Sequence, residues 1–419
     1  MSLRVVARRR AILLAASGAA VLVLVLVLAL VAVRSSSSSP SPSRSVPVAT
    51  GIGSTPPMGW NSWNHFGCSV DAALIERTAD ALAANGLQKL GYDSVDIDDC
   101  WMAPRRDAQT GELVPDPVKF PQGIAAVARY LHARGFLLGI YEDAGTETCA
   151  GFPGSLGHER LDARTFARWG VDILKYDNCN HAGQSTTSQY IARYVAMRDA
   201  LRATGRSIFF AICEWGVHHP WTWGAGVGQS WRTTHDIADN YGSMLAIFRQ
   251  NVALSAFAGP GGWNDPDMLE VGNGGMTATE QRTEFTLWAA MAAPLVAGAD
   301  MRSLSPEDLA IYSNAEAIAI DQDARGAQAA PVRQNGKPAG SGGLWVLSKP
   351  LADGGRAVVL FNSTDTQQTM STTASAVGLH GSRFAIHDVW SGTDSVSSGE
   401  IGAMIAPHEA AMYRVTVDR

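Results

Sequence analysis

Five short apolar runs in the first half of this chain end in acidic or aromatic residues. They are Tyr92–Asp99, Phe136–Asp143, Ile173–Asp177, Ile208–Trp215 and Ser230–Asp236. One carboxylate at the exit of a buried strand is an ordinary cap. Carboxylates at several exits, accompanied by Trp, Tyr and Lys, indicate strands that converge on one polar pocket. The pattern predicts an enzyme that acts on a polar, uncharged substrate such as a sugar.

Hydrolysis of a glycosidic bond needs two carboxyl groups, one on each side of the anomeric carbon of the sugar. The candidates at the predicted strand exits are Asp98, Asp99, Asp143, Asp177, Glu214, Asp236 and Asp267. In a barrel of parallel strands these exits share one face, which is where active sites form. The sequence therefore supplies more carboxylates than the reaction requires.

Two of these acids have a basic residue nearby on the same predicted strand. Lys175 and Asp177 are two residues apart, so their side chains leave the strand in the same direction. A lysine ammonium beside a carboxylate favours the ionised form that a nucleophile requires. Arg232 and Asp236 are four residues apart at another exit. A structural ion pair is the alternative interpretation of the Lys175–Asp177 pair.

Other classes of function fit the sequence less well. Acids together with His235 could bind a divalent ion, but the ten His form neither an H-x-H nor an H-E-x-x-H motif. We therefore expect no metal and no cofactor. The net charge is −6, and residues 1–47 hold six Arg and no acid, so the remaining chain carries −12. This acidic body argues against a nucleic-acid partner. A non-catalytic sugar-binding barrel remains the alternative.

The N-terminus has the pattern of a targeting segment. Arg4 and Arg8 to Arg10 precede an uncharged apolar run, Ala11–Val33, and a serine- and proline-rich stretch, Ser35–Ser43, follows Arg34. We expect residues 1–34 to be a signal peptide or an N-terminal membrane anchor, and residues 35–50 to be a flexible linker. Either interpretation places the catalytic body outside the cytoplasm, secreted or tethered to the membrane.

Five cysteines are consistent with that location. They are Cys68, Cys100, Cys149, Cys179 and Cys213. The sequence alone does not fix their pairing. If each cysteine follows a successive strand, Cys68 neighbours Cys100, Cys149 neighbours Cys179, and Cys213 stays reduced. The alternative, five reduced and buried cysteines, is disfavoured by the export signal.

The spacing of the polar exits predicts the architecture. Exits near Trp63, Asp99, Asp143, Asp177, Trp215, Asp236, Asp267 and Asp300 are separated by strand-helix lengths. Amphipathic stretches such as Ala72–Asn85 and Ile124–Arg134 lie between them, each followed by Gly. Eight such units predict a (β/α)8 TIM barrel over residues 51–325. A doubly wound sheet is the alternative, but no G-x-G-x-x-G motif opens a first strand-helix turn.

The last part of the chain has a different pattern. Short alternating runs replace the helical periodicity, and turn residues separate them. The runs are Leu344–Ser348, Arg356–Asn362, Gln367–Thr372, Arg383–Val389 and Met412–Val417. They predict a small antiparallel β-sandwich domain over residues 335–419, to which we assign no chemistry.

Six sequence blocks resemble the signature of glycoside hydrolase family 27, the α-galactosidases. They are Met58–Trp63, Asp98–Trp101, Lys175–Cys179, Cys213–Trp215, Trp231–Asp236 and Gly259–Met268. They occur in the order of the family, and the resemblance extends from about Ile52 to the C-terminus. It implies a (β/α)8 barrel with a C-terminal antiparallel β-domain, and a retaining exo-glycosidase that hydrolyses terminal α-D-galactosyl residues.

The resemblance also implies roles for individual residues. Asp177 matches the nucleophile and Asp236 the general acid/base. Asp98 and Asp99 match the acids that bind the galactose 4- and 6-hydroxyls, and Trp63 matches a residue that packs on the sugar. Other pocket positions fall on Tyr141, Lys175, Cys213, Glu214, Trp215, Arg232 and Asp267. The disulfides of the family imply the pairs Cys68–Cys100 and Cys149–Cys179.

The resemblance also extends to proteins with two related activities on the same framework. A β-L-arabinopyranosidase removes a sugar that lacks the hydroxymethyl group, whereas Asp99 keeps the acid expected to bind a 6-hydroxyl. An α-N-acetylgalactosaminidase needs room at the 2-position, and Glu214 and Trp215 argue against that room. We therefore expect the substrate to be an α-galactoside.

Overall fold

The computed structural model describes residues 51–334 and 336–418. The predicted signal or anchor (1–34) and linker (35–50) lie outside the described residues. Within those described ranges, no helix is both long enough and apolar enough to cross a bilayer.

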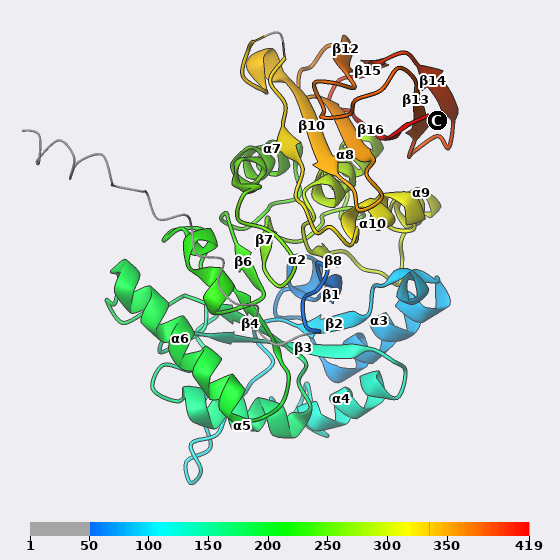
Figure 1. Ribbon diagram of the computed structural model, residues 1–419. Coiled ribbons are helices and arrows are strands. Elements are labelled where there is room, and N and C mark those ends of the chain that lie inside the picture. Colours follow the sequence, from blue (N-terminus) through cyan, green and yellow to red (C-terminus); the bar gives the residue numbers. More distant parts are fainter. Residues whose placement is uncertain (1–50, 335, 419) are drawn as a thin grey trace, which may run out of the picture. The chain divides into compact units, whose positions relative to one another are not determined.

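Eight parallel strands form the sheet of the barrel (Figure 1). They are β1 (Met58–Asn61), β2 (Ser94–Ile97), β3 (Leu137–Asp143), β4 (Ile173–Asp177), β5 (Phe209–Ile212), β6 (Ser230–Arg232), β7 (Trp263–Asp265) and β8 (Leu295–Ala297). The hydrogen-bonded order is β7-β6-β5-β4-β3-β2-β1-β8. Leu269, just past β7, bridges in parallel to Ala297 of β8 and so closes the ring. All eight predicted exits follow these strands by a few residues at most, which confirms the predicted barrel.

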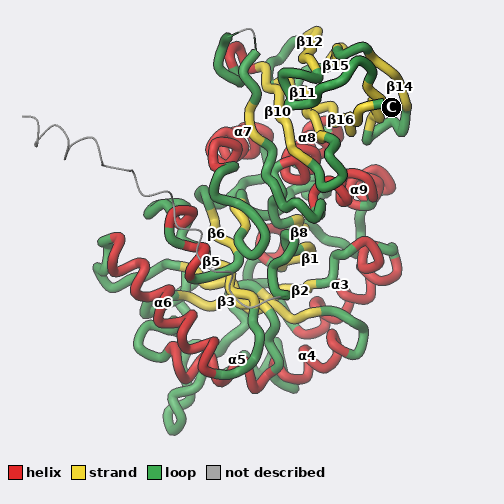
Figure 2. The backbone as a smooth tube through the Cα atoms, in the orientation of Figure 1, coloured by secondary structure: helices red, strands yellow, loops and turns green. Residues whose placement is uncertain are grey.

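Helices connect successive strands and cover the outside of the sheet (Figure 2). They are α2 (Trp63–Phe66), α3 (Ala72–Ala84), α4 (Ile124–His132), α5 (Glu159–Trp169), α6 (Thr187–Ala203), α7 (Tyr241–Asn251), α8 (Ala278–Ala290), α9 (Pro306–Tyr312) and α10 (Ala315–Asp321). Local signals set their ends. The Asp71 carboxylate accepts a hydrogen bond from Leu74 N at 2.6 Å and begins α3. Gly170, with a φ of 87°, ends α5 in the left-handed conformation that glycine tolerates.

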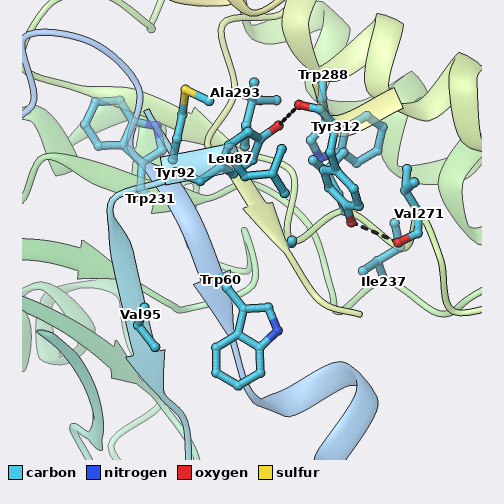
Figure 3. Close-up of a cluster of buried hydrophobic side chains, with 14 of the residues drawn as sticks. Trp60, Leu87, Tyr92, Val95, Trp231, Ile237, Val271, Trp288, Ala293 and Tyr312 are labelled. Carbon is cyan, nitrogen blue, oxygen red and sulfur yellow. Dashed lines mark hydrogen bonds between the residues drawn. The ribbon is translucent and has the colours of Figure 1, made fainter. Parts of the chain in front are cut away.

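The two faces of the barrel sheet differ in chemistry. Outward residues such as Trp60 and Val95, which are paired across β1 and β2, pack in an apolar layer (Figure 3). Within this layer the Tyr92 hydroxyl donates to the Tyr312 carbonyl at 3.0 Å. Inward residues line a cavity under the carboxyl ends of the strands, and polar side chains such as Asp96 lie there beside apolar ones such as Phe209. The inside of this barrel therefore holds charged side chains within a layer that Val, Ile and Leu commonly fill.

The C-terminal domain consists of two antiparallel sheets. The larger has the order β14-β13-β16-β11-β10-β9, and the smaller pairs β12 with β15. The strands are β9 (Ala330–Pro331), β10 (Leu344–Pro350), β11 (Arg356–Asn362), β12 (Gln368–Thr373), β13 (Phe384–Asp388), β14 (Asp394–Ser397), β15 (Glu400–Ile405) and β16 (Ala410–Val417). Leu360, Met370, Phe384 and Ile401 from both sheets share one buried core. This arrangement confirms the predicted sandwich.

His408 joins this domain to the barrel. Its imidazole lies between the carboxylates of Glu280 on α8, at 2.7 Å, and Asp365, at 2.9 Å. It also stacks on Tyr241 of α7 with ring centroids 3.8 Å apart. Burial lowers the pKa of His408, but hydrogen bonds to Glu280 and Asp365 outweigh that effect and raise the pKa above its ordinary value. The charged form of His408 therefore stabilises the junction.

We predict that His408→Gln destabilises the protein more at pH 5.5 than at pH 8.5. The folded-state pKa of His408 is raised, so its contribution is complete below the unfolded pKa and disappears as pH rises through the folded pKa. The expected difference in unfolding free energy between the two pH values is about 0.5–1 kcal/mol, because the pair is partly exposed. Thermal unfolding at both pH values measures it, with the exposed His380→Gln as the control. An equal loss at both pH values would contradict the prediction.

Candidate active site

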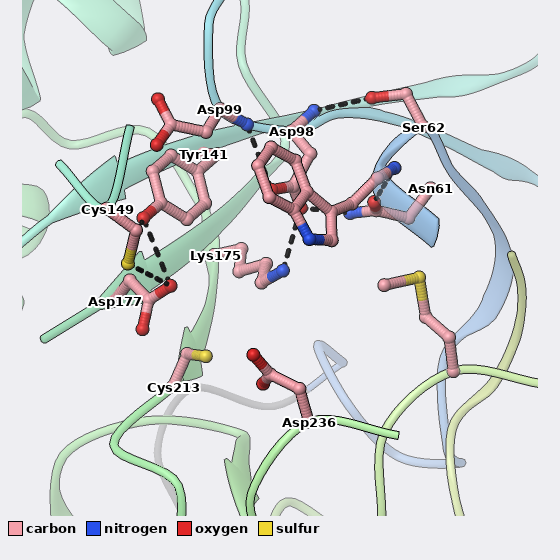
Figure 4. A network of polar contacts seen from close by, with 12 residues as sticks. Asn61, Ser62, Asp98, Asp99, Tyr141, Cys149, Lys175, Asp177, Cys213 and Asp236 are labelled. Atoms are coloured by element: carbon pink, nitrogen blue, oxygen red, sulfur yellow. Dashed lines mark hydrogen bonds and ion pairs between the residues drawn. The ribbon is translucent and has the colours of Figure 1, made fainter. Parts of the chain in front are cut away.

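Asp177 and Asp236 open into the same pocket at the carboxyl ends of the barrel strands. Figure 4 shows their side chains facing the same space. The lining residues are Trp63, Asn64, Asp98, Asp99, Tyr141, Cys149, Lys175, Asp177, Arg232, Asp236, Asp267 and Met268. Nine residues expected in the site from the sequence are therefore brought together on the face where barrel enzymes place their chemistry.

Asp177 is buried at the end of β4 and is held by two donors. The Tyr141 hydroxyl donates to its Oδ2 at 3.0 Å, and Asn178 N donates to its Oδ1 at 2.9 Å. Burial raises the pKa of Asp177 to about 6, with Lys175 acting to lower it and the Asp236 carboxylate acting to raise it. The carboxylate is therefore fixed in orientation and ionises near neutral pH.

Lys175 makes its ion pair with Asp98, not with Asp177. Its Nζ lies 2.7 Å from Asp98 Oδ2, which also accepts a hydrogen bond from Asn61 Nδ2 at 2.8 Å. The other Asp98 oxygen accepts from Asp99 N at 2.9 Å. Lys175 thus acts on Asp177 through its electrostatic field, which differs from the direct partnership that the spacing suggested.

Asp99 is anchored by backbone donors. Its Oδ1 accepts from Cys100 N at 2.6 Å, and its Oδ2 accepts from Ala150 N at 2.9 Å. A carboxylate oxygen has two lone pairs, so both Asp98 and Asp99 retain capacity to accept hydroxyl donors from the pocket. Their orientation is set before any ligand arrives.

Arg232 bridges two acids at the opposite wall. Its Nη2 lies 2.9 Å from Asp236 and 2.9 Å from Asp267. Asp267 in turn accepts from Ile237 N at 2.9 Å, which fixes the backbone beside Asp236. Burial acts to raise the pKa of Asp236, but Arg232 and Lys175 outweigh it, and the net effect lowers that pKa. Arg232 therefore favours the carboxylate form of Asp236 and fixes its orientation.

Two disulfides brace this face of the barrel. Cys68 pairs with Cys100 and Cys149 with Cys179, with Cα atoms 5.2 and 5.1 Å apart, and Cys213 is free and buried. Cys149 Sγ lies 3.4 Å from Asp177 Oδ2. A disulfide sulfur carries no proton, so this is a packing contact and not a donated hydrogen bond. The second disulfide is thus a wall of the pocket.

Of the three other residues assigned to the pocket from the sequence, Cys213 lies beside Asp177 and Asp236 (Figure 4), and its thiol interacts with the Asp177 carboxylate. Glu214 and Trp215 are not among the lining residues: Glu214 is fully buried and accepts from His218 N at 2.9 Å, and Trp215 follows at a positive φ of 57°. Side chains alternate along a strand and its extension, so when Cys213 points inward Glu214 points away from the barrel axis. Burial raises the pKa of Glu214 to about 8.

Three of the lining residues were not predicted from the sequence to belong to the pocket. Cys149 was assigned only to a disulfide, and nothing in its local sequence indicates contact with Asp177. Asn64 and Met268 directly follow the singled-out Trp63 and Asp267, so their place just after a strand exit was a usable signal.

The donor set does not form a metal site of the usual kind. Ligand atoms of Asp143, Cys149, Asp177 and Cys179 lie within 4.8 Å of one another. Both sulfurs belong to one disulfide, however, and a disulfide cannot supply the thiolates that bind metals. Only two carboxylates of this group remain as ligands.

Comparisons with known proteins agree with this geometry. The family profile described as "Alpha galactosidase A" matches residues 55–323, and the one described as "Alpha galactosidase C-terminal beta sandwich domain" matches residues 341–415. The chain is 50% identical over 368 residues to "Alpha-galactosidase" of Oryza sativa subsp. japonica, covering 87% of this chain and 86% of the rice protein.

Solved structures show the same relationship. α-Galactosidase I from Mortierella vinacea superposes with a TM-score of 0.84 at 36% identity, covering 88% of this chain and 99% of that one. The α-galactosidase from Saccharomyces cerevisiae with raffinose gives 0.81 at 32% identity, covering 89% and 100%. The chain therefore belongs to glycoside hydrolase family 27, the family of the α-galactosidases.

Proposed function

We propose that the protein, an α-galactosidase by its family, hydrolyses terminal non-reducing α-D-galactosyl residues of galacto-oligosaccharides, galactomannans or glycoconjugates with net retention. The observation that carries the proposal is that Asp177 and Asp236 line one pocket. Asp98 and Asp99 line the same pocket. A small polar pocket ringed by carboxylates suits one uncharged sugar residue with many hydroxyls.

Two carboxyl groups divide the reaction between them. In the first step Asp177 attacks the anomeric carbon, and Asp236 protonates the departing glycosidic oxygen. In the second step Asp236 removes a proton from water, which attacks the anomeric carbon and releases Asp177 and galactose. This role assignment requires the two carboxyl groups to be about 5–5.5 Å apart.

The charges around Asp236 support a change of role between the steps. Arg232 lowers the pKa of Asp236 in the free structure, and the negative charge of ionised Asp177 opposes that effect in the first step, in which Asp236 must carry a proton. The ester formed in the first step removes that charge, so the pull of Arg232, 2.9 Å away, then favours the carboxylate. Asp236 is thereby prepared to act as the base of the second step.

We also propose that the protein acts outside the cytoplasm. Its two disulfides suit an oxidising compartment. The Arg-rich N-terminus followed by the uncharged run Ala11–Val33 provides an export signal or a membrane tether.

We predict that Asp177→Asn lowers kcat on nitrophenyl α-galactoside by at least about 10³-fold, because the reaction loses its nucleophile. Asp177→Gly with added azide should restore turnover and yield β-galactosyl azide, since the small anion replaces the missing carboxylate. This product shows that the variant is folded. Wild-type turnover in the Asn variant would exclude Asp177 as the nucleophile.

We predict that the first galactose released is the α-anomer. Two successive displacements at the anomeric carbon return the starting configuration. Proton NMR during the first minutes of hydrolysis distinguishes the anomers before mutarotation mixes them. Initial release of β-galactose would require an inverting mechanism and a different role for Asp177.

We predict that nitrophenyl α-galactoside is preferred to nitrophenyl β-L-arabinopyranoside, and that Asp99→Asn reduces this preference. The variant should lose about 10–100-fold in kcat/KM on the galactoside and less on the arabinopyranoside, which lacks the hydroxymethyl group that Asp99 is expected to bind. Equal losses on both substrates would mean that Asp99 does not recognise the 6-hydroxyl.

A further inference from the structure

A second carboxylate lies directly behind the proposed nucleophile. Asp143, the last residue of β3, is fully buried and is in register with Asp177, the last residue of β4. Carboxylate oxygens of the two residues lie within 4.8 Å of each other. Asp143 is not among the residues that line the pocket, so it does not contact the sugar itself.

Both oxygens of Asp143 accept backbone hydrogen bonds. Gly145 N donates to Oδ1 at 2.6 Å, and Cys179 N donates to Oδ2 at 2.7 Å. The first donor belongs to the loop after β3 and the second to the loop after β4. One side chain therefore ties together two loops that are more than thirty residues apart in sequence.

The two loops pack closely at this tie. A Cβ at Gly145 would overlap the Cys179 and Asn180 carbonyl oxygens, so the backbone there needs glycine. The far end of the first loop returns to the same residue, since Ser155 N donates to the Asp143 carbonyl at 2.9 Å. Asp143 thus anchors the loop of residues 144–155 at both ends.

This anchored loop carries two contacts to the reacting groups. Its Cys149 Sγ lies 3.4 Å from Asp177 Oδ2 and 3.3 Å from the Tyr141 hydroxyl. Its Ala150 N donates to Asp99 Oδ2 at 2.9 Å. The position of the loop therefore bears on the nucleophile and on a proposed hydroxyl-binding acid at the same time.

We propose that Asp143 is a positioning residue for the glycosidase reaction. It clamps the loops after β3 and β4 so that the Cys149–Cys179 disulfide holds Asp177 in its attacking orientation. An aspartate is suited to this role because its two oxygens can face two N–H donors. Asparagine has the same shape but only one acceptor oxygen, so its NH2 group would face one of those N–H donors and release that loop.

The test uses Asp143→Asn and a covalent probe, a galacto-configured cyclophellitol epoxide. The Asp177 carboxylate attacks an epoxide carbon and forms a C–O bond with it. The C–O bond of the epoxide breaks at the same time, and Asp236 donates a proton to the epoxide oxygen. The labelled fraction counts folded sites, and the labelling rate reports the reactivity of Asp177. We expect the labelled fraction to stay near one while the labelling rate and kcat fall by about 10–10²-fold, because a displaced nucleophile loses its alignment. The inhibition constant of free galactose should rise by a smaller factor than the labelling rate falls, because Asp143 does not contact the sugar and acts on the hydroxyl-binding Asp99 only through Ala150 N.

Asp388→Asn is the matched control. Asp388 accepts Trp390 N and Ser391 N, both at 2.9 Å, on its Oδ1 alone, so the Asn variant keeps that acceptor oxygen, and the residue lies in the C-terminal domain. This variant should keep the wild-type labelling rate. If Asp143→Asn does not fold, Asp143→Glu replaces it, since a longer carboxylate keeps the charge but misplaces the two acceptors.

A wild-type labelling rate, or a loss of kcat that merely follows the loss of labelled sites, would overturn the proposal. The inference rests on the proposed function, yet the two fail separately. If the Asn variant of Asp177 is inactive and that of Asp143 is unaffected, only the positioning role is wrong. If the Asn variant of Asp177 is fully active, the catalytic assignment itself is wrong.

Discussion

The structure of this site depends on how two cations and a set of backbone N–H groups stabilise many acids, all but Asp236 buried. Lys175 and Arg232 are the basic residues that line the pocket. The carboxylates around them or just behind them are Asp98, Asp99, Asp143, Asp177, Asp236 and Asp267. Burying a carboxylate without partners is costly, so each one needs a cation or donors. Asp98 and the Asp236–Asp267 pair use the cations, whereas Asp99 and Asp143 rely on backbone N–H groups.

That division explains why loops, as well as strands, build the pocket. A side chain at a strand exit can receive further backbone N–H donors when the loop after the neighbouring strand packs against it. Ala150, after β3, reaches Asp99, after β2, and Cys179, after β4, reaches Asp143, at the end of β3. A disulfide joins the two loops that supply these donors. The carboxylates therefore order the loops, and the loops in turn fix the carboxylates. Substitution of such an acid is expected to disturb geometry as well as charge.

The sequence predicts the parts of this arrangement that follow from strand periodicity. Each strand exit is marked by an acidic or aromatic residue, so the barrel, the face that carries the pocket and most of its acids could be inferred. The interior position of Lys175 follows from its two-residue spacing to Asp177. The ion-pair partner of Lys175 does not follow from the sequence. Asp98 lies 77 positions away in the chain, and only three-dimensional distances decide between Asp98 and Asp177 as the partner. The same limit explains why Cys149 was not foreseen as a pocket wall.

Errors in the sequence interpretation also have local physical causes. Glu214 lies between two residues of a matching block, yet strand alternation turns it away from the barrel axis. In the sandwich, β14 was not expected because Asp394–Ser397 has no alternating apolar side and is largely exposed, and Gly402 interrupts the alternation of β15. β14 depends on pairing with β13, which contributes the buried side, whereas β15 pairs with β12 and itself contributes Ile401 and Ile405 to the core.

The small side chains inside the barrel link the fold to the chemistry. A barrel filled with branched apolar residues would leave Lys175 and Arg232 without room to extend upward from the strands. Here Gly139 is required because a Cβ would overlap Asp96, and Ala211 and Ser230 keep the neighbouring positions small. Most of the apolar packing that stabilises the domain lies in the layer between the sheet and the helices. Stability and catalysis are thereby assigned to opposite faces of the same strands, which lets the inner face hold charges that a packed core would exclude.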